Sequence, residues 1–280
     1  DMFLFFNDPE EDFQWMMEGY RKGIITDERL EEALTRILGT KAALGLHKKA
    51  KTEILPEKEV AMAKIGLEEN KAIAKEVSDK AITLVKNTQD VLPIAPEKTK
   101  RVLLVEAKGF DGGFGKFIEI MGGAKKKPIE IVKELLEAKG FDVEIWESPI
   151  DKIMKLPKEE MAQALGNVYA GKRPIAELTS KYDLIINIAN VNASVDQRLQ
   201  WPPSKGTPDI PFYVNEIPTI FISVKCPFHL ADVPQVKTYI NTYDDNQQTL
   251  EALVEKLVGN TEFKGISPVD AFCGFGDTRF

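Results

Sequence analysis

The chain opens on an unbroken apolar run, Met2–Phe6, which follows Asp1 and ends at Asn7-Asp8-Pro9. An apolar run of this length bounded by turn residues is typical of a fully buried strand. A protein rarely begins inside a core strand, so we expect that the preceding part of a larger protein is missing from this sequence. We also expect the run to pair with other protein or to lie against its own helices, because an exposed apolar edge strand promotes aggregation.

Two amphipathic helices are predicted after this run. Asp8 can cap the first helix, Pro9 suits its first turn, and the helical pattern ends at about Lys22. The second helix begins at Thr26-Asp27-Glu28 and ends at Gly45. Its apolar residues recur at helical spacing, at Leu30, Leu34, Ile37 and Leu38.

A domain boundary is predicted after the second helix. Residues 47–56 are rich in lysine and lack periodicity, which is typical of a linker. From residue 57 the pattern predicts a long helical region that ends near Lys86. Its core-facing side is expected to carry Ile73, Val77, Ala81 and Leu84.

Short apolar strands then alternate with amphipathic helices. The strands are predicted at 101–105, 143–146, 184–189, 219–224 and 238–241. The helices are predicted at about 127–139, 158–169 and 247–258. Continuous apolar strands separated by helices favour a largely parallel sheet covered by helices on both faces. We therefore predict a doubly wound α/β fold for residues 57–280.

Composition narrows the possible functions. The 280 residues are 43% hydrophobic, which is enough to bury substantial cores. The formal net charge of −7 gives no overall attraction for nucleic acid or an anionic membrane, and the N-terminal apolar run is too short to span a bilayer. Two cysteines and two histidines leave little room for a metal site, so we expect neither a metal nor a cofactor.

A glycine-rich stretch, Gly109–Lys116, follows a predicted strand, where phosphate-binding loops often lie. A Walker A loop would need glycine in place of Phe110 and serine or threonine in place of Phe117. The dinucleotide fingerprint that starts at Gly113 meets Ile118 in its third glycine position. We therefore interpret the stretch as a loop at the carboxyl edge of the sheet and not as a nucleotide site.

Two shorter motifs have ordinary structural interpretations. Cys226 and His229 have metal-like spacing, but the second ligand pair of a structural zinc site is absent, so we expect a buried cysteine and an ordinary loop histidine. Asn192-Ala193-Ser194 fits the glycosylation sequon, yet no secretory signal is visible and such triplets often occur by chance.

Asp1 differs from most of the 44 acidic residues because it would lie at one end of the predicted buried strand. Other carboxylates, such as Glu31-Glu32 and Glu159-Glu160, lie on predicted helices, where a solvated face is the usual position. For Asp1 a capping or supporting role is at least as strongly indicated as catalysis.

Several segments carry a family resemblance. They are DMFL at residues 1–4, GYRKGIITDERL and the helix that follows it at 19–46, AITLVKN and VLPI at 81–94, the strands and loops at 218–241, and SPVD at 267–270. In this order they resemble the C-terminal portion of glycoside hydrolase family 3, and in particular its β-N-acetylhexosaminidase-like branch. The resemblance covers essentially the whole chain.

The resemblance implies three regions. Residues 1–46 would be the last strand and closing helices of a catalytic barrel, 47–56 a linker, and 57–280 the α/β sandwich domain. The parent would remove terminal β-linked N-acetylhexosamine by a retaining double displacement. The family's nucleophile and, in the hexosaminidase-like branch, its acid/base precede the point where this chain begins. Some relatives take their acid/base from the second domain, but no carboxylate here matches that role, so no catalytic residue is assigned. We expect this chain alone to be an inactive scaffold.

The resemblance also implies partners. The full-length parent would bind a saccharide substrate, and the chain would associate with an N-terminal barrel fragment or with itself through Met2, Phe3, Leu4, Phe5 and Phe6. An alternative is a non-catalytic carbohydrate- or protein-binding α/β module. In that case the loops Gly109–Gly115 and Asn190–Pro203, with Trp201, would frame the site. The sequence leaves open a cytoplasmic or a secreted or cell-surface location.

Overall fold

The computed structural model describes all residues except 3, 110–125, 167–174, 192–197, 200 and 202–205. The contacts divide the chain into two compact units, Asp1–Leu67 and Glu68–Phe280. This division lies later in the sequence than the linker predicted at 47–56. The assignment of 1–46, 47–56 and 57–280 to a barrel remnant, a linker and a sandwich domain stays a prediction.

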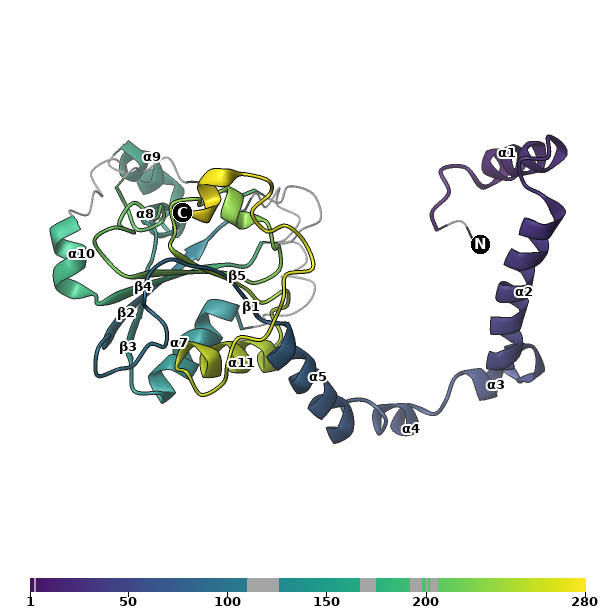
Figure 1. Cartoon of the computed structure of the whole chain (residues 1–280), viewed down its shortest axis with the longest axis horizontal. Coiled ribbons are helices and arrows are strands. Elements are labelled where there is room, and N and C mark those ends of the chain that lie inside the picture. Colours follow the sequence, from purple (N-terminus) through teal and green to yellow (C-terminus); the bar gives the residue numbers. More distant parts are fainter. Residues whose placement is uncertain (3, 110–125, 167–174, 192–197, 200, 202–205) are drawn as a thin grey trace. The chain divides into compact units, whose positions relative to one another are not determined.

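The first unit is built from helices, and the two predicted ones are confirmed (Figure 1). Helix α1 spans Pro9–Arg21, and the Asp8 carboxylate caps it by accepting from two backbone N–H groups. Helix α2 spans Asp27–Leu44, with Thr26 as its N-cap and Gly45 as its C-cap in the left-handed conformation that glycine tolerates best. The 3₁₀ helix η1 (Leu46–Lys48) and helices α3 (Lys51–Ile54) and α4 (Lys58–Met62) follow.

The strand predicted over Met2–Phe6 is wrong for the described residues of that run. Met2, Leu4, Phe5 and Phe6 are not in a strand, and Leu4 and Phe5 have exposed fractions of 83% and 91%. A strand satisfies its backbone N–H and C=O groups by pairing with a neighbouring strand. The described residues of the first unit form no other strand, so this run has none to pair with in its own unit.

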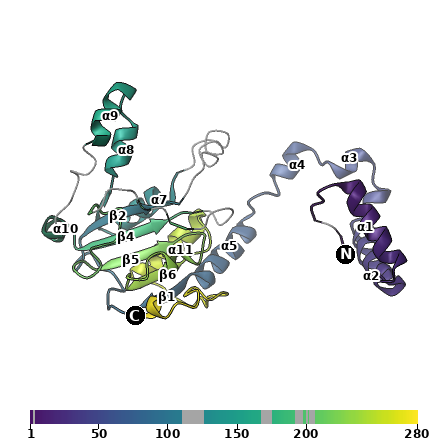
Figure 2. The same cartoon turned by 90° about the horizontal axis from the view of Figure 1, so that it is seen from above.

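The second unit contains a six-stranded sheet in the order β1-β6-β5-β4-β2-β3 (Figure 2). Strand β1 (Thr83–Asn87) pairs with β6 in antiparallel orientation, and the other neighbouring pairs are parallel. The parallel strands are β2 (Arg101–Ala107), β3 (Asp142–Ile145), β4 (Leu184–Ala189), β5 (Thr219–Ser223) and β6 (Thr238–Asn241). The predicted α/β fold with a largely parallel sheet is confirmed.

Helices and loops cover the two faces of this sheet. Figure 1 shows α7 (Pro128–Ala138) and α11 (Gln247–Leu257) on one side, where they bury the largest apolar cluster. Two smaller clusters lie elsewhere in the unit, one around Phe221 and Tyr239 and one around Tyr213. All six residues of β4 are buried, as expected for an inner strand that is covered on both faces. In the described part of this unit, the other helices are α5 (Glu68–Ala81), α8 (Pro149–Met154), α9 (Lys158–Gly166), α10 (Ile175–Lys181), η3 (His229–Ala231) and η4 (Gly276–Arg279).

The long helical region predicted to end near Lys86 is wrong in its last part. Helix α5 spans Glu68–Ala81, and the chain then enters β1. Leu84 therefore lies on a strand, and Ile73 and Val77, expected to face the core, each have an exposed fraction of 59%. Pairing of the β1 backbone with β6 has overridden the helical periodicity.

Within the part of the chain that the structure describes, no helix combines the length and the apolar character needed to cross a membrane.

Candidate functional site

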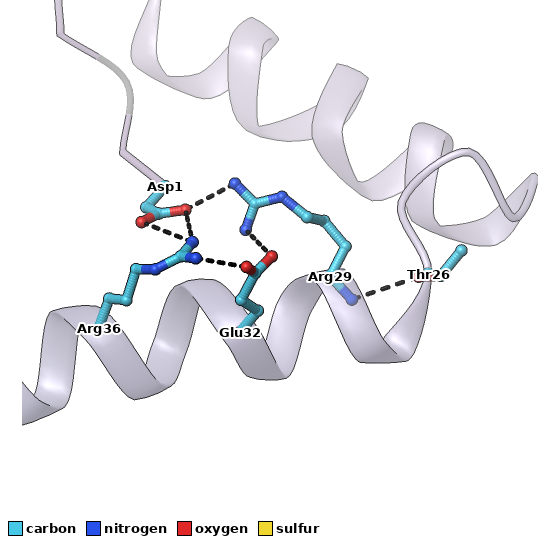
Figure 3. Close-up of polar contacts among 5 residues, drawn as sticks. All are labelled: Asp1, Thr26, Arg29, Glu32 and Arg36. Carbon is cyan, nitrogen blue, oxygen red and sulfur yellow. Dashed lines mark hydrogen bonds and ion pairs between the residues drawn. The ribbon is translucent and has the colours of Figure 1, made fainter.

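Asp1, the carboxylate singled out in the sequence, contacts α2 (Figure 3). Its Oδ1 atom accepts a hydrogen bond from Arg29 Nη2 at 2.6 Å and one from Arg36 Nη1 at 3.3 Å. The Asp1 side chain is 26% exposed, so both ion pairs remain within reach of water. Two guanidinium groups thus engage the carboxylate, which suits attachment of the N-terminal segment to α2.

One face of α2 positions these arginines. Glu32 lies between them in the sequence and forms ion pairs with Arg29 at 3.5 Å and with Arg36 (Figure 3). Thr26 fixes the start of the helix by accepting a hydrogen bond from the Arg29 N–H at 3.2 Å. Residues three and four positions apart share one face of a helix, which explains why these side chains meet. The network supports a structural role for Asp1 and provides no acid/base pair for catalysis.

In the second unit, three loops meet at the carboxyl edge of the sheet. Gly109 follows β2 and forms an isolated antiparallel bridge with Leu199, which follows β4. A Cβ atom on Gly109 would lie 2.4 Å from Val191 Cγ1, so only glycine fits there without displacing the neighbouring loop. Asp232, just after η3, accepts a hydrogen bond from the Leu199 N–H at 3.1 Å. We call Gly109, Arg198, Leu199 and Asp232 the loop junction.

The Asp232 carboxylate has two roles in the loop junction. Oδ2 holds the Leu199 backbone, and Oδ1 forms an ion pair with Nε of Arg198. The Asp232 side chain is only 5% exposed, whereas that of Arg198 is 65% exposed. A buried carboxylate therefore anchors one side of an exposed guanidinium group. The sequence analysis did not select either residue, because neither belongs to a recognisable motif.

Ser223, Cys226 and His229 form a buried polar cluster beside this junction. Ser223 Oγ lies 2.8 Å from His229 Nδ1 and donates its own proton to the Cys226 carbonyl oxygen. The serine oxygen therefore accepts from Nδ1–H, and the histidine does not act as a base toward it. Burial raises the pKa of the Cys226 thiol and favours its protonated form. These contacts are those of a structural cluster and not of an activated nucleophile.

The outcomes for the two motifs in this region differ. Cys226 is buried as predicted, but His229, expected to be an ordinary loop histidine, is completely buried in η3. The described residues contain no group of three or more His, Cys, Asp or Glu side chains that could hold a metal ion. The glycine-rich stretch beyond Gly109 and the sequon at Asn192 lie outside the described residues.

A shallow cavity of about 440 Å³ lies near the amino ends of β2 and β3. Its two lining cations each form an ion pair: Arg101 with the neighbouring Asp183 at 2.6 Å, and Lys181 with Glu144 at 2.7 Å. The hydrogen bonds from Arg101 hold the pKa of Asp183 below its usual value. Ligands of open α/β sheets bind at the opposite, carboxyl edge. We therefore assign this cavity to surface ion pairing.

The comparisons with known proteins bear on the family resemblance. A search of protein-family models gives no match. The whole chain is 38% identical over 283 aligned residues to a β-N-acetylglucosaminidase/β-glucosidase from Cellulomonas fimi, of which it covers 45%. The chain is thus similar to the C-terminal part of glycoside hydrolase family 3 proteins.

Solved structures extend this similarity to the fold. The chain is 36% identical to a β-glucoside phosphorylase, BglX, with a TM-score of 0.65 over 98% of this chain and 44% of that protein. The same phosphorylase bound to 2FGlc gives a TM-score of 0.64 over 97% of this chain and 43% of that protein. The chain thus spans a little under half the length of these relatives.

Proposed function

We propose that this chain is the C-terminal part of a retaining, β-N-acetylhexosaminidase-like family 3 enzyme. The observation that carries the proposal is the 38% identity, across the entire chain, to a protein named β-N-acetylglucosaminidase/β-glucosidase. The complete enzyme would hydrolyse terminal β-linked N-acetylhexosamine through a glycosyl-enzyme intermediate. A saccharide is accordingly its proposed substrate class.

In this proposal the chain alone is a scaffold without catalytic residues. Residues 1–46 provide the closing helices of the barrel, and the α/β domain supports it. A retaining mechanism needs a nucleophile and an acid/base about 5–5.5 Å apart on a rigid framework. Among the described residues, the contacts of Asp1 with two arginines and the donor role of Ser223 toward a carbonyl are structural, which supports the scaffold role.

The apolar run at the start of the chain supports the proposed contact with a barrel fragment or with a second copy. Met2, Leu4, Phe5 and Phe6 are at least 57% exposed in the chain alone. Removing such side chains from water is favourable by roughly 25 cal/mol for each Å² of apolar surface. A partner that supplies a neighbouring strand would satisfy the backbone of this run as well as its side chains.

A second candidate concerns the acceptor in the complete enzyme. The relative that is 36% identical is named a β-glucoside phosphorylase, in which phosphate takes the place that water has in a hydrolase. The complete enzyme could therefore be a phosphorylase of the same saccharide class. Comparing product formation with and without inorganic phosphate separates the two: a sugar 1-phosphate indicates phosphorolysis, and the free sugar indicates hydrolysis.

The experiment that tests the scaffold proposal uses the 280-residue chain itself. The chain is incubated with the 4-nitrophenyl glycosides of N-acetyl-β-glucosamine and β-glucose, with and without phosphate. We expect no turnover above the uncatalysed rate under either condition. Robust release of nitrophenol that follows the protein through purification would overturn the scaffold proposal. The same assay on an enzyme extended by its barrel tests the sugar preference.

A further inference from the structure

The two cysteines of the chain, Cys226 and Cys273, contact the same residue. Cys226 follows β5, and its sulfur accepts a hydrogen bond from the Phe228 N–H. Cys273 lies near the C-terminus, and its Sγ atom is 3.9 Å from the Phe228 carbonyl oxygen. The backbone of a single residue therefore lies between two thiols that come from distant parts of the sequence.

A tight turn positions the Cys273 backbone. Its φ angle is 54°, in the left-handed region that residues other than glycine seldom occupy. The Asp270 carbonyl oxygen accepts from the Cys273 N–H at 3.0 Å, and Asp270 Oδ2 accepts from the Gly274 N–H at 2.8 Å. The neighbouring Phe272 packs against a buried apolar cluster of the second unit. Several contacts thus hold the C-terminal turn on the α/β domain.

The Cys273 thiol is held more weakly than its backbone. Its contacts with the carbonyl oxygens of Phe228 and Ala271 are 3.9 and 3.8 Å long, and a thiol is a weak donor. Rotation of this side chain toward Cys226 therefore loses little. A disulfide requires Cα atoms about 4.4–6.8 Å apart, so forming a bridge places the turn close against the segment after β5.

We propose that Cys226 and Cys273 form a reversible disulfide, which fastens the C-terminal segment to the segment after β5. Cys226 is 1% exposed, whereas Cys273 is half-buried, so an oxidant in solution reaches Cys273 first. The oxidant is a low-molecular-weight disulfide such as glutathione disulfide. This site of covalent modification goes beyond the proposed function and does not depend on it.

The reaction consists of two exchanges. The Cys273 thiolate attacks one sulfur of glutathione disulfide, which forms a mixed disulfide and releases one glutathione thiolate. The Cys226 thiolate then attacks the Cys273 sulfur, which closes the bridge and releases the second glutathione thiolate. The protons that the two cysteines lose end on the two glutathione thiols. Two cysteine thiols are thus oxidised and one molecule of glutathione disulfide is reduced.

The pKa values of the two thiols make this reaction dependent on pH. Burial raises the pKa of the Cys273 thiol and Asp270 raises it further, whereas Arg198 lowers it. Asp232 and Cys226 also raise it, and burial raises the pKa of Cys226. Because the thiolate is the attacking species, we expect the bridge to form about tenfold faster or more at about pH 9 than at about pH 7.

The test uses the 280-residue chain with both thiols reduced. The chain is incubated with glutathione disulfide at low protein concentration, unreacted thiols are blocked with iodoacetamide in urea, and the intact mass is measured. We expect a monomeric product that has lost two hydrogen atoms and carries neither glutathione nor a blocking group. Peptide mapping should find Cys226 linked to Cys273. A chain that keeps both thiols, stops at the mixed disulfide or is linked only between copies would overturn the proposal.

Single variants test the order of attack. Cys226→Ala should stop at a mixed disulfide on Cys273, because no second thiol can displace the glutathione. Cys273→Ala should gain almost no glutathione, because its remaining thiol is buried. Thermal unfolding under reducing conditions checks that both variants are folded. If Cys273→Ala gained glutathione as fast as Cys226→Ala, the assigned order of attack would be wrong.

A comparison of the oxidised and reduced chains tests whether the bridge fastens the C-terminal segment. We expect the oxidised chain to unfold at a higher temperature, and amide hydrogen exchange at residues 271–279 to slow by about fivefold or more. Exchange within β4 serves as the internal control and should not change. The oxidant should alter neither property in Cys273→Ala. A bridge that forms without either effect would overturn its role as a fastening.

Discussion

The ammonium group of Lys256 on α11 lies 2.8 Å from a carboxylate oxygen of Asp79 on α5. The same nitrogen donates to the Glu262 carbonyl oxygen at 2.7 Å. The Lys256 side chain is completely buried, whereas 36% of the Asp79 side chain is exposed. Together with the hydrogen bond between Ser78 and Thr249, at 2.9 Å, this pair attaches α5 to α11.

Removing the two partners of this pair should have unequal effects. Asp79→Ala leaves a buried ammonium group without its carboxylate, and we expect the free energy of unfolding to fall by about 1–3 kcal/mol. Lys256→Met keeps the apolar stem and leaves a carboxylate that water can reach, so we expect a change within about 1 kcal/mol. Urea denaturation of both variants measures these changes in the free energy of unfolding.

Glu76→Ala on the same helix is the control, because its partner Lys80 is exposed, and we expect little change. Equal losses for Asp79→Ala and Lys256→Met would contradict the assignment.

The same pair predicts a dependence on pH. The hydrogen bond from Lys256 is the largest cause that lowers the pKa of Asp79 below its ordinary value of 3.8. A carboxyl group whose pKa is lower in the folded state stabilises the fold fully above its unfolded value, and this contribution is lost as pH falls through the folded value. The unmodified chain should therefore have a larger free energy of unfolding than Asp79→Asn at about pH 6. This difference should shrink below about pH 4, where Asp79 becomes protonated. A difference that grows on acidification would exclude this explanation.

Gly109 should tolerate no side chain. Alanine would place its Cβ atom 2.4 Å from Val191 Cγ1, so we expect Gly109→Ala to destabilise the fold by about 1–3 kcal/mol. Val191→Ala in the same chain should recover part of this loss, because it removes the atom in conflict.

Gly39→Ala is the control, since nothing lies within 4 Å of a Cβ there and the position is helical. We expect that control to be neutral or stabilising. Thermal unfolding compares the variants, and an unchanged Gly109→Ala would contradict the packing of the junction.

Local signals account for what the sequence predicted well. Helices α1 and α2 begin at Asp8 and Thr26 because those side chains cap the first backbone N–H groups, and such caps are visible in the sequence. Strand β4 was predicted at its observed bounds, because an inner parallel strand is apolar throughout. These features depend on neighbours in the sequence.

Contacts between distant segments account for what was missed. Strand β1 follows a helical pattern directly and becomes a strand only by pairing with β6, which lies far along the chain. The ion pair of Arg198 and Asp232 joins two loops that lie far apart in the sequence, and no residue pattern in either loop predicts the contact. Asp1 was singled out because it would lie at one end of a buried strand, which the described residues do not form, and its two arginine partners were visible only once α2 and the N-terminal segment were in place.

The hydroxyl of Ser223 should matter for stability and not for chemistry. Ser223→Ala would remove the acceptor of the buried His229 Nδ1–H and the donor to the Cys226 carbonyl oxygen. We expect a loss of about 1–3 kcal/mol in the free energy of unfolding, because buried polar groups would lose a partner. Ser267→Ala is a suitable control, since that hydroxyl is exposed and contacts only Val269. If Ser223→Ala were as stable as the unmodified chain, the hydrogen bonds assigned to this cluster would be wrong.

The exposed apolar run should make the isolated chain self-associate. Leu4 and Phe5 are more than 80% exposed, and burying them against a second copy or a barrel fragment would remove both from water without refolding α1. We expect the mean mass measured by light scattering to rise with protein concentration. Leu4→Ser combined with Phe5→Ser should abolish that rise, whereas Ile24→Ser, which removes a similarly exposed apolar side chain outside the run, should leave it unchanged. A chain that stays monomeric at every concentration tested, or a rise that persists in the double variant, would show that this run is not an association surface between copies.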